Sequence, residues 1–512
     1  MKSNGTKIIF PFITVGMTAI LAGLLLLLRD YWLLLQDGHC PLLQQPQRVI
    51  IVPFVLIVVG LVLTTALLLR YTHDVHTSRD TLKFLLTHDP LTGLPNRISA
   101  EQALQKLINA KRDFTIITID IDDFKSLNYY YSRDYGDKLL VKLAERLQTL
   151  ESDGIYSVYR FTSDEFTLLL RDRQLRPNCA ELYFLRQLLS EPFSTDDTPI
   201  FIKTSMGVAV SDARIQDCET FLSDTNIAMY EAKKHGRNKT AFFTEDMRRV
   251  VQEKQRTVKD IEYACQHGGF YVVFQPQIDV RTGDICGYEA LARLKIAQDG
   301  TERTIPPISF IPAAEKSGYI TKIGRIITEK TIRHMVEWRR NGFQLHKVSI
   351  NYSVGQIADK GYVNYLSDLL EENAISPDLV CMEITESLFL ENRKQAMELF
   401  DQFRAIGVQL ALDDFGTGYS SLSYLAYLPV TTVKIDKSMI DTYLSQEDKC
   451  QFIQNIVNLV HSLHMQLTVE GIEELWQYRK ICEFGADHIQ GYFFSKPMPA
   501  DEVEAFTPTL PK

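Results

Sequence analysis

The sequence predicts two N-terminal transmembrane helices, then an α/β domain, then a TIM-like (β/α)8 barrel. Three observations lead to this order. Two apolar runs near the N-terminus contain no charged residue, strand and helix patterns alternate up to about residue 245, and apolar runs after residue 250 repeatedly end in polar residues. A chain of 512 residues has room for two or three domains, each with its own hydrophobic core.

The apolar runs at 8–28 and 49–69 predict the membrane helices. Each is about as long as the ~20 residues that a helix needs to cross a bilayer. A cleaved signal peptide would have a shorter apolar core and would not explain the second run. Basic residues lie before the first run and after the second: Lys2, Lys7, Arg70, Arg79 and Lys83. This bias predicts a membrane anchor at 1–70 with both termini and both later domains in the cytoplasm.

Composition excludes two other classes of protein. The net charge of -9 argues against a general nucleic-acid binder, which needs a basic surface. The eight cysteines form no CxxC pair and no zinc-type spacing with histidine, which favours free thiols over a disulfide framework.

The α/β domain is predicted at 88–245, after a linker helix at 71–87. HDPLTGLPNR has the residues of a turn before a helix, and FTIITIDIDDF reads as a buried strand that ends in carboxylates. YSVYRFTSDEFTLLL predicts two strands around a tight turn. FIKTSMGVAV then predicts another strand before a helix, and strands that alternate with helices indicate an α/β fold.

A barrel is predicted at 250–505 because β-rich apolar runs there end in polar residues before a helix begins. The instances are CGYEALARL, KVSINYS, LVCMEITES, VQLALDDFG, TTVKIDKS, LTVEGIE and HIQGYFFS. Strands of a parallel barrel are apolar, and their carboxyl ends carry the active site in (β/α)8 enzymes. The polar residues at these ends are Glu289, Asn351, Glu383, Asp413, Asp414, Lys434, Asp436, Glu470, Glu473 and Gln490.

So many carboxylates at one barrel mouth would repel one another unless cations balance them. Oxygen ligands suit Mg²⁺ or Mn²⁺, and adjacent acids such as Asp413 and Asp414 can share two ions. Two such ions form a clamp for phosphate-ester hydrolysis, in which Lys434 could orient the attacking water. Alone, EAL consists of common helix residues, DD or KID is most often a solvated strand end, and GTGYSS would be only a turn. Together, in this order, they predict a metal-dependent phosphoryl or ester hydrolase.

The second domain resembles the EAL family of cyclic di-GMP phosphodiesterases over about half of the chain. The resemblance rests on YEALARL, SINYS, MEITES, LDDFGTGYSSLSYL, VKIDKS, VEGIEE and QGYFFSKP. It implies a modified TIM barrel and conversion of cyclic di-GMP to linear pGpG. Two Mg²⁺ or Mn²⁺ ions would be held by Glu289, Asn351, Glu383, Asp413, Asp414 and Glu470.

The resemblance also implies roles around these ions. Lys434 would hold the attacking water, supported by Asp436 and Glu473. Gln275, Arg293 and Gln490 would contact the substrate, with the forked guanidinium of Arg293 suited to a phosphate. Glu386 would anchor the loop DFGTGYSS.

The first domain resembles the GGDEF family of diguanylate cyclases in HDPLTGLPNR, DIDDFKSLN, YGDKLL and AKKHGRN. Its fold would be the sheet of nucleotide cyclases. The signature reads TSDEF, however, and Thr162 and Ser163 bring Cβ atoms into a turn where glycine permits positive φ. Neighbouring family motifs are also altered, at Leu127–Tyr129 and at Ser132 and Arg133. The resemblance implies a residual GTP site formed by Asp120, Asn128, Asp137, Asp164, Lys233 and Arg237.

The leading hypothesis is therefore a membrane-anchored cyclic di-GMP phosphodiesterase of the bacterial inner membrane. Its first domain would be a degenerate regulator that binds GTP or forms a homodimer. One alternative is a bifunctional enzyme with residual cyclase activity. Another is a non-catalytic receptor or scaffold that binds cyclic di-GMP or a protein partner in the same signalling system.

Overall fold

The structure is a computed structural model. It describes residues 21, 23–25, 28–29, 31–33 and 36, and residues 46–508 apart from 196–197, 213–216, 299–300, 387, 389–392, 417–424 and 447–448. The chain divides into two compact units, one ending at Arg248 and the other beginning at Arg249. The boundary lies within helix α8 (Glu245–His267).

The predicted membrane helix at 8–28 lies outside the described residues except for a few positions. The second predicted span, 49–69, and the predicted linker helix, 71–87, both lie in one continuous helix, α2 (Pro46–Thr87). Within the described part of the chain, no helix combines the length and apolar character that crossing a membrane requires. The two transmembrane helices therefore have no support from the structure and stay a prediction from the sequence.

The first unit is built on a five-stranded mixed sheet in the order β2-β3-β1-β6-β7. Its strands are β1 (Phe114–Ile121), β2 (Tyr156–Thr162), β3 (Glu165–Arg171), β6 (Thr204–Val210) and β7 (Thr240–Phe242). β1 is buried along its whole length because it lies between β3 and β6, antiparallel to both. A separate hairpin pairs β4 (Phe193–Thr195) with β5 (Thr198–Ile200).

Helices cover both faces of this sheet. They are α3 (Arg97–Asn109), α4 (Phe124–Tyr131), α5 (Arg133–Gln148), α6 (Ala180–Ser190) and α7 (Cys218–Lys234). One hydrophobic cluster contains Ile117 and Ile119 of β1 with leucines of α5 and α6. The other contains Phe114 and Ile116 of β1 with residues of α3 and α7. The α/β architecture agrees with the prediction from the sequence.

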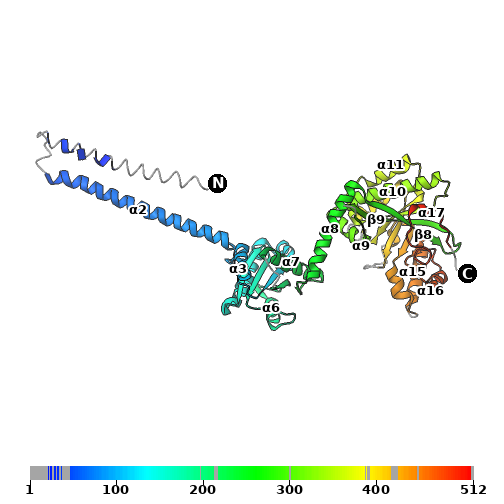
Figure 1. The fold of residues 1–512 in the computed structure, drawn as a ribbon, viewed down its shortest axis with the longest axis horizontal. Coiled ribbons are helices and arrows are strands. Elements are labelled where there is room, and N and C mark those ends of the chain that lie inside the picture. The colour runs from blue at the N-terminus through cyan, green and yellow to red at the C-terminus, as the bar shows by residue number, and fades with distance from the viewer. Residues whose placement is uncertain are drawn as a thin grey trace. The chain divides into compact units, whose positions relative to one another are not determined.

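The second unit contains an eight-stranded barrel (Figure 1). Its strands are β8 (Phe270–Asp279), β9 (Ile285–Gln298), β11 (Lys347–Tyr352), β12 (Val380–Thr385), β13 (Gln409–Phe415), β14 (Thr432–Ile435), β15 (Gln466–Val469) and β16 (His488–Ile489). The barrel closes where β8 pairs with both β9 and β16, and β10 (Thr301–Ile305) extends it outside β9.

Helices connect and surround these strands. The longer ones are α9 (Pro307–Ser317), α10 (Ile320–Arg340), α11 (Tyr362–Glu372), α13 (Arg393–Ala405), α15 (Cys450–Ser462) and α16 (Leu475–Phe484). Short helical turns complete the barrel at η3 (Val354–Ala358), η4 (Pro377–Leu379), η5 (Leu425–Tyr427), α14 (Lys437–Met439), η6 (Ile440–Leu444) and α17 (Ala500–Val503).

The barrel departs in one respect from the all-parallel arrangement that strand-end reasoning predicts. β8 runs antiparallel to both of its neighbours. The reason is the short turn at 280–284 between β8 and β9, since a parallel connection needs a crossover of about a dozen residues or more. The carboxyl group of Asp279 accepts the backbone N–H groups of Arg281 and Thr282, which stabilises this turn.

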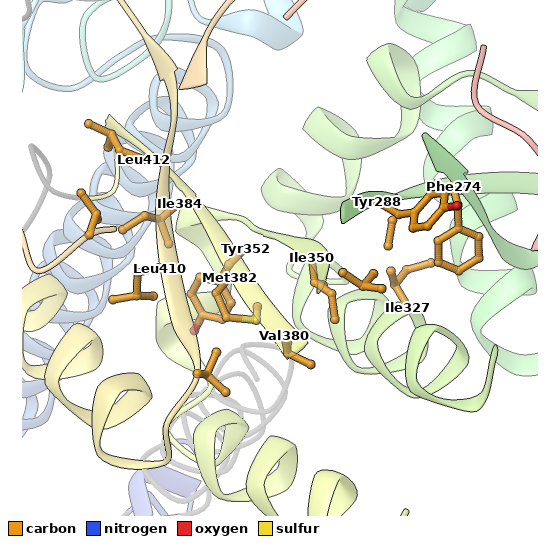
Figure 2. Packing of buried hydrophobic residues seen from close by; sticks show 14 of the residues in the cluster. Phe274, Tyr288, Ile327, Ile350, Tyr352, Val380, Met382, Ile384, Leu410 and Leu412 are labelled. Atoms are coloured by element: carbon orange, nitrogen blue, oxygen red, sulfur yellow. The ribbon is translucent and has the colours of Figure 1, made fainter. Parts of the chain in front are cut away.

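Side chains alternate along the barrel strands between the helical layer and the lumen. On β12, Val380, Met382 and Ile384 belong to the hydrophobic core, whereas Cys381 and Glu383 line the barrel interior. Figure 2 shows apolar residues of several strands packed in this core, including Ile350, Leu410 and Leu412. The apolar side chains therefore pack against the surrounding helices. The side chains between them face the lumen, where polar residues can form a site.

Phe403 of α13 is central to this packing. It is fully buried and lies edge-on to Tyr352 of β11 and Tyr362 of α11, with ring centroids 5.6 and 6.2 Å away. We expect Phe403→Ala to lower the free energy of unfolding by about 3–5 kcal/mol, because no neighbour can fill the space. Urea denaturation would measure this, with the 85% exposed Ile308 changed to alanine as the control. A loss below about 1 kcal/mol would contradict the assigned packing.

Candidate active site

Six of the predicted polar side chains meet at one mouth of the barrel. They are Glu289 on β9, Asn351 on β11, Glu383 on β12, Asp413 on β13, Lys434 on β14 and Glu470 directly after β15. Apart from β10, the strands from β9 to β15 are parallel neighbours, so their carboxyl ends lie at the same edge of the barrel. The structure thus brings together acids that are almost 200 residues apart in the sequence.

The Lys434 ammonium lies at the centre of this group. Its Nζ is 2.6 Å from an oxygen of Glu470, 2.7 Å from Glu383, 3.3 Å from Glu289 and 3.5 Å from Asp413. Lys434 is only 1% exposed, and Glu383 equally so. One buried cation thus contacts four carboxylates at this mouth of the barrel.

Amide side chains fix the position of Glu289. Asn351 donates to its Oε1 at 2.7 Å, and Gln490 donates to its Oε2 at 2.5 Å. Gln490 also donates to Gln275 and accepts from Gln277. Gln277 was not among the predicted site residues. The period-two spacing of FQPQ could have identified it, because Gln275 and Gln277 face the same side of β8.

A β-bulge explains how two adjacent acids serve one site. The register of β13 with β14 shifts between Leu412 and Phe415, and Asp414 has a left-handed φ of 56°. In a regular strand Asp413 and Asp414 would point to opposite faces, whereas here both line the same cavity. Burial and the charge of Asp413 raise the pKa of Asp414 to about 6.

The charges at the centre shift one another's proton affinities. Burial and the neighbouring carboxylates raise the pKa of Glu383 well above its ordinary value, and burial raises that of Glu470 to about 8. Burial also raises the pKa of Asp413. Glu289 differs, because Lys434 and the amide hydrogen bonds outweigh burial and lower its pKa. Burial opposes the charge on Lys434, but the surrounding carboxylates raise its pKa well above the ordinary value.

The donor chemistry of this group fits Mg²⁺ or Mn²⁺. All of the acids offer oxygen ligands, as these hard cations prefer. Glu383 Oε1 is buried and, among the described residues, has no hydrogen-bond partner, so this oxygen remains available to a cation. As they stand, no three acidic, histidine or cysteine side chains of the described chain are spaced to hold a metal ion. The Lys434 ammonium lies between the carboxylates instead.

The two predicted supporting residues have hydrogen-bond or ion-pair partners outside the carboxylate group. Asp436 caps α14 by accepting the backbone N–H of Ser438 at 2.8 Å. The side chain of Glu473 is 43% exposed and pairs with Lys437. Glu473 follows the strand in a loop and turns toward Lys437 in this arrangement. Its supporting role beside Lys434 stays a prediction.

A cavity of about 380 Å³ adjoins the carboxylate group. Glu289, Asn351, Asp413 and Asp414 line it together with Arg293 of β9 and apolar residues of α9 and α10. The Arg293 guanidinium donates to the backbone of Ala292 at 2.9 Å. Its position beside the acids is compatible with the predicted contact to a substrate phosphate. Glu386 is buried just after β12, whereas residues 417–424 of the loop it was predicted to anchor lie outside the described residues.

The predicted GTP residues of the first unit are only partly assembled. Lys233 of α7 forms an ion pair with Asp120 of β1 at 2.6 Å. Asn128 of α4 packs against Gly136, next to Asp137 on α5. Of the remaining two, Asp164 lies in the hairpin turn, close enough for its charge to raise the pKa of Asp120, and Arg237 pairs with Asp123 at 3.6 Å.

The TSDEF segment forms the predicted hairpin, with β2 ending at Thr162 and β3 beginning at Glu165. Ser163 has a φ of 30°, so the turn imposes the left-handed backbone on a residue with a Cβ atom. The buried Arg160 holds this turn by donating to the Ser163 carbonyl at 2.6 Å and to Asp89 at 2.6 Å.

Replacing Ser163 by glycine is expected to stabilise the first unit. Glycine removes the strain of a serine in the left-handed conformation, and this gain outweighs the entropic cost of glycine. We expect the free energy of unfolding to rise by about 0.5–1 kcal/mol. The midpoint of the thermal transition of this unit would report the gain. Ser163→Ala, which keeps the Cβ atom, serves as the control. An equal gain in both variants would mean that backbone strain is not the cause.

Comparison with known proteins agrees with this architecture. The family described as "Diguanylate cyclase, GGDEF domain" matches residues 86–239, and the family described as "EAL domain" matches residues 258–497. The bifunctional diguanylate cyclase/cyclic di-GMP phosphodiesterase MucR of Pseudomonas aeruginosa is 32% identical over 82% of this chain and 62% of its own length. The cyclic di-GMP phosphodiesterase PdeR of Escherichia coli is 32% identical over 83% of this chain and 64% of its own length.

Among solved structures, a MucR phosphodiesterase in complex with c-di-GMP is 31% identical, with a TM-score of 0.45. The match covers 48% of this chain and 99% of that one. The chain spans about half to two thirds of the length of the curated relatives it matches. Both domain matches follow the order of the two structural units. The chain therefore belongs to the family of proteins that carry a GGDEF domain followed by an EAL domain.

Proposed function

We propose that the EAL barrel hydrolyses cyclic di-GMP to linear pGpG. The observation that carries this proposal is the convergence of four carboxylates, Asn351 and Lys434 at one barrel mouth beside a 380 Å³ cavity. The relatives that are named as cyclic di-GMP phosphodiesterases support the choice of substrate. A receptor that only binds the dinucleotide would not require so costly a group of buried acids.

Divalent ions would be held by the acids at this mouth. The residues we assign to them are Glu289, Asn351, Glu383, Asp413, Asp414 and Glu470. When bound, Mg²⁺ or Mn²⁺ would activate water and stabilise the leaving oxygen of the phosphodiester. Gln490 and Asn351 orient Glu289, since each donates a hydrogen bond to one of its two oxygens. Lys434 would donate to the attacking water, and Arg293 would bind a phosphate oxygen from the rim.

For the GGDEF domain we propose a regulatory role without cyclase turnover. Its signature turn carries Thr162 and Ser163 in place of two glycines, and Ser163 occupies a left-handed conformation. The Asp120–Lys233 pair would still be available to the metal and phosphate of a bound GTP. Residual cyclase activity is the second candidate, because the relative MucR is named as bifunctional.

Location and assembly are proposals that rest on the sequence. We propose attachment to the bacterial inner membrane through the uncharged runs 8–28 and 49–69, with both domains in the cytoplasm. A homodimer and protein partners in cyclic di-GMP signalling are further expectations from the family.

The decisive experiment incubates the purified chain with cyclic di-GMP and Mg²⁺ or Mn²⁺ and follows pGpG by chromatography. We expect pGpG from the native protein and none from Glu289→Ala. Adding GTP tests the first domain: GTP consumption would establish cyclase activity, and a changed hydrolysis rate without consumption would establish sensing. Binding of cyclic di-GMP by a folded protein that forms no pGpG would favour the receptor.

A further inference from the structure

The Lys434 ammonium has more carboxylate partners than one lysine needs for orienting a water molecule. Its Nζ lies within 3.5 Å of oxygens from four acids, and all four come from different barrel strands or strand ends. In the described part of the chain, no second lysine or arginine forms an ion pair with these four acids. One cation therefore faces four acidic groups.

The surroundings of this cluster give water little access. Lys434 and Glu383 have side chains that are 1% exposed, those of Glu289 and Asp413 are 7% and 12% exposed, and that of Glu470 is 20% exposed. Charges that are removed from water need compensation from within the protein, and a buried group that loses its partner is strongly destabilising. Without Lys434, four acidic side chains would lie together at the barrel mouth with no positive charge between them.

A divalent cation at this mouth would use the same carboxylate groups. Lys434 contacts Oε2 of Glu383, Oε1 of Glu470 and Oδ1 of Asp413, and these residues are also the proposed metal ligands. An ammonium group and a metal ion repel each other, and both cannot remain in full contact with the same small group of carboxylates. Metal binding therefore has to loosen the contacts of Lys434.

We propose that Lys434 is the counter-ion that holds the barrel mouth together when no metal is bound, and that it competes with divalent cations for the carboxylates. The competition rests on the proposed metal-dependent function, whereas the stabilisation of the metal-free barrel does not. If Lys434 served only to hold a water molecule, its loss would lower the reaction rate. It would change neither the metal affinity nor the stability of the metal-free protein.

The test uses Lys434→Met, which keeps most of the side-chain length and removes the charge. In chelator, we expect the thermal midpoint of the full chain to fall by about 10 °C. In a Mn²⁺ titration followed by the electron paramagnetic resonance of free Mn²⁺, we expect the dissociation constant to tighten about tenfold or more. Lys480→Met is the matched control, because Lys480 is a partly exposed lysine that pairs with Glu483 at 3.7 Å and should change neither value.

A double variant covers the case in which Lys434→Met does not fold. Lys434→Met with Glu383→Gln removes one negative charge together with the positive one, so we expect the metal-free midpoint to recover by about half or more of the loss. An unchanged midpoint in chelator for Lys434→Met would overturn the counter-ion role. If the native protein binds Mn²⁺ and Lys434→Met binds it with the same affinity, the competition would be overturned but the counter-ion role would not. Absence of Mn²⁺ binding in the native protein would instead overturn the proposed metal-dependent function, and the competition with it.

Discussion

Glu383→Gln is expected to reduce the kcat/KM of cyclic di-GMP hydrolysis by about 1,000-fold or more, a loss of about 4 kcal/mol of transition-state stabilisation. Glu383 is fully buried at the barrel mouth, with one oxygen on Lys434 at 2.7 Å and the other free of hydrogen bonds from the described residues. Glutamine has the same shape but no charge, and its NH₂ group cannot ligate a metal. Chromatographic measurement of pGpG formation would give the rate.

The matched control for this variant is Glu398→Gln on α13. Glu398 is 61% exposed and forms only a distant pair with Lys394 at 4.0 Å, so its loss should leave activity within about twofold. Thermal unfolding of both variants would establish that each is folded. Retention of more than about a tenth of native activity by folded Glu383→Gln would remove Glu383 from the catalytic centre.

The position of the site could be predicted from the sequence because barrel strands obey a period of two. Apolar residues such as Met382 and Ile384 face the helices, so the acid between them has to face the lumen. Glu289 and Asp413 were predicted because each lies where an apolar run ends in polar residues. This reasoning could not reveal the antiparallel direction of β8, which depends on the short turn at 280–284 rather than on the strand pattern.

Residues beyond strand ends were less predictable because no periodicity fixes the direction of a loop side chain. Glu473 was expected to support Lys434, and in this structure it pairs with Lys437 at the surface. Asp414 was also predicted at the site, and it does line the cavity, because a bulge and a left-handed backbone place this second acid there. The sequence DD suggested shared ligands, but only the register shift explains how neighbours can reach one site.

In the first unit the turn was predictable and its stabilisation was not. TSDEF between two apolar runs indicated a hairpin, and the left-handed Ser163 agrees with the expectation that glycine suits this turn. Arg160, which joins the turn to Asp89, gave no sequence signal, because its two partners lie on separate segments of the chain.

Removal of divalent ions is the second change for which we expect a very large effect. Treatment with EDTA followed by desalting should reduce pGpG formation by about 100-fold or more, because four acids around one lysine cannot supply the positive charge that a phosphodiester transition state requires. Added Mg²⁺ or Mn²⁺ should restore the rate. EDTA that has been saturated with Mg²⁺ before addition serves as the control and should not inhibit.

Ca²⁺ separates a metal role in catalysis from a role in folding. It binds oxygen ligands at about 2.3–2.6 Å with six to eight partners, whereas Mg²⁺ requires about 2.0–2.1 Å in octahedral geometry. Ca²⁺ should therefore raise the thermal midpoint of the EDTA-treated protein by neutralising the acids, yet restore less than about a tenth of the activity. Equal activity with Ca²⁺ and Mg²⁺ would mean that charge neutralisation alone is sufficient. Full activity after EDTA would mean that the carboxylates around Lys434 act without metal, and the assignment of Glu289, Glu383 and Asp413 as ligands would be wrong.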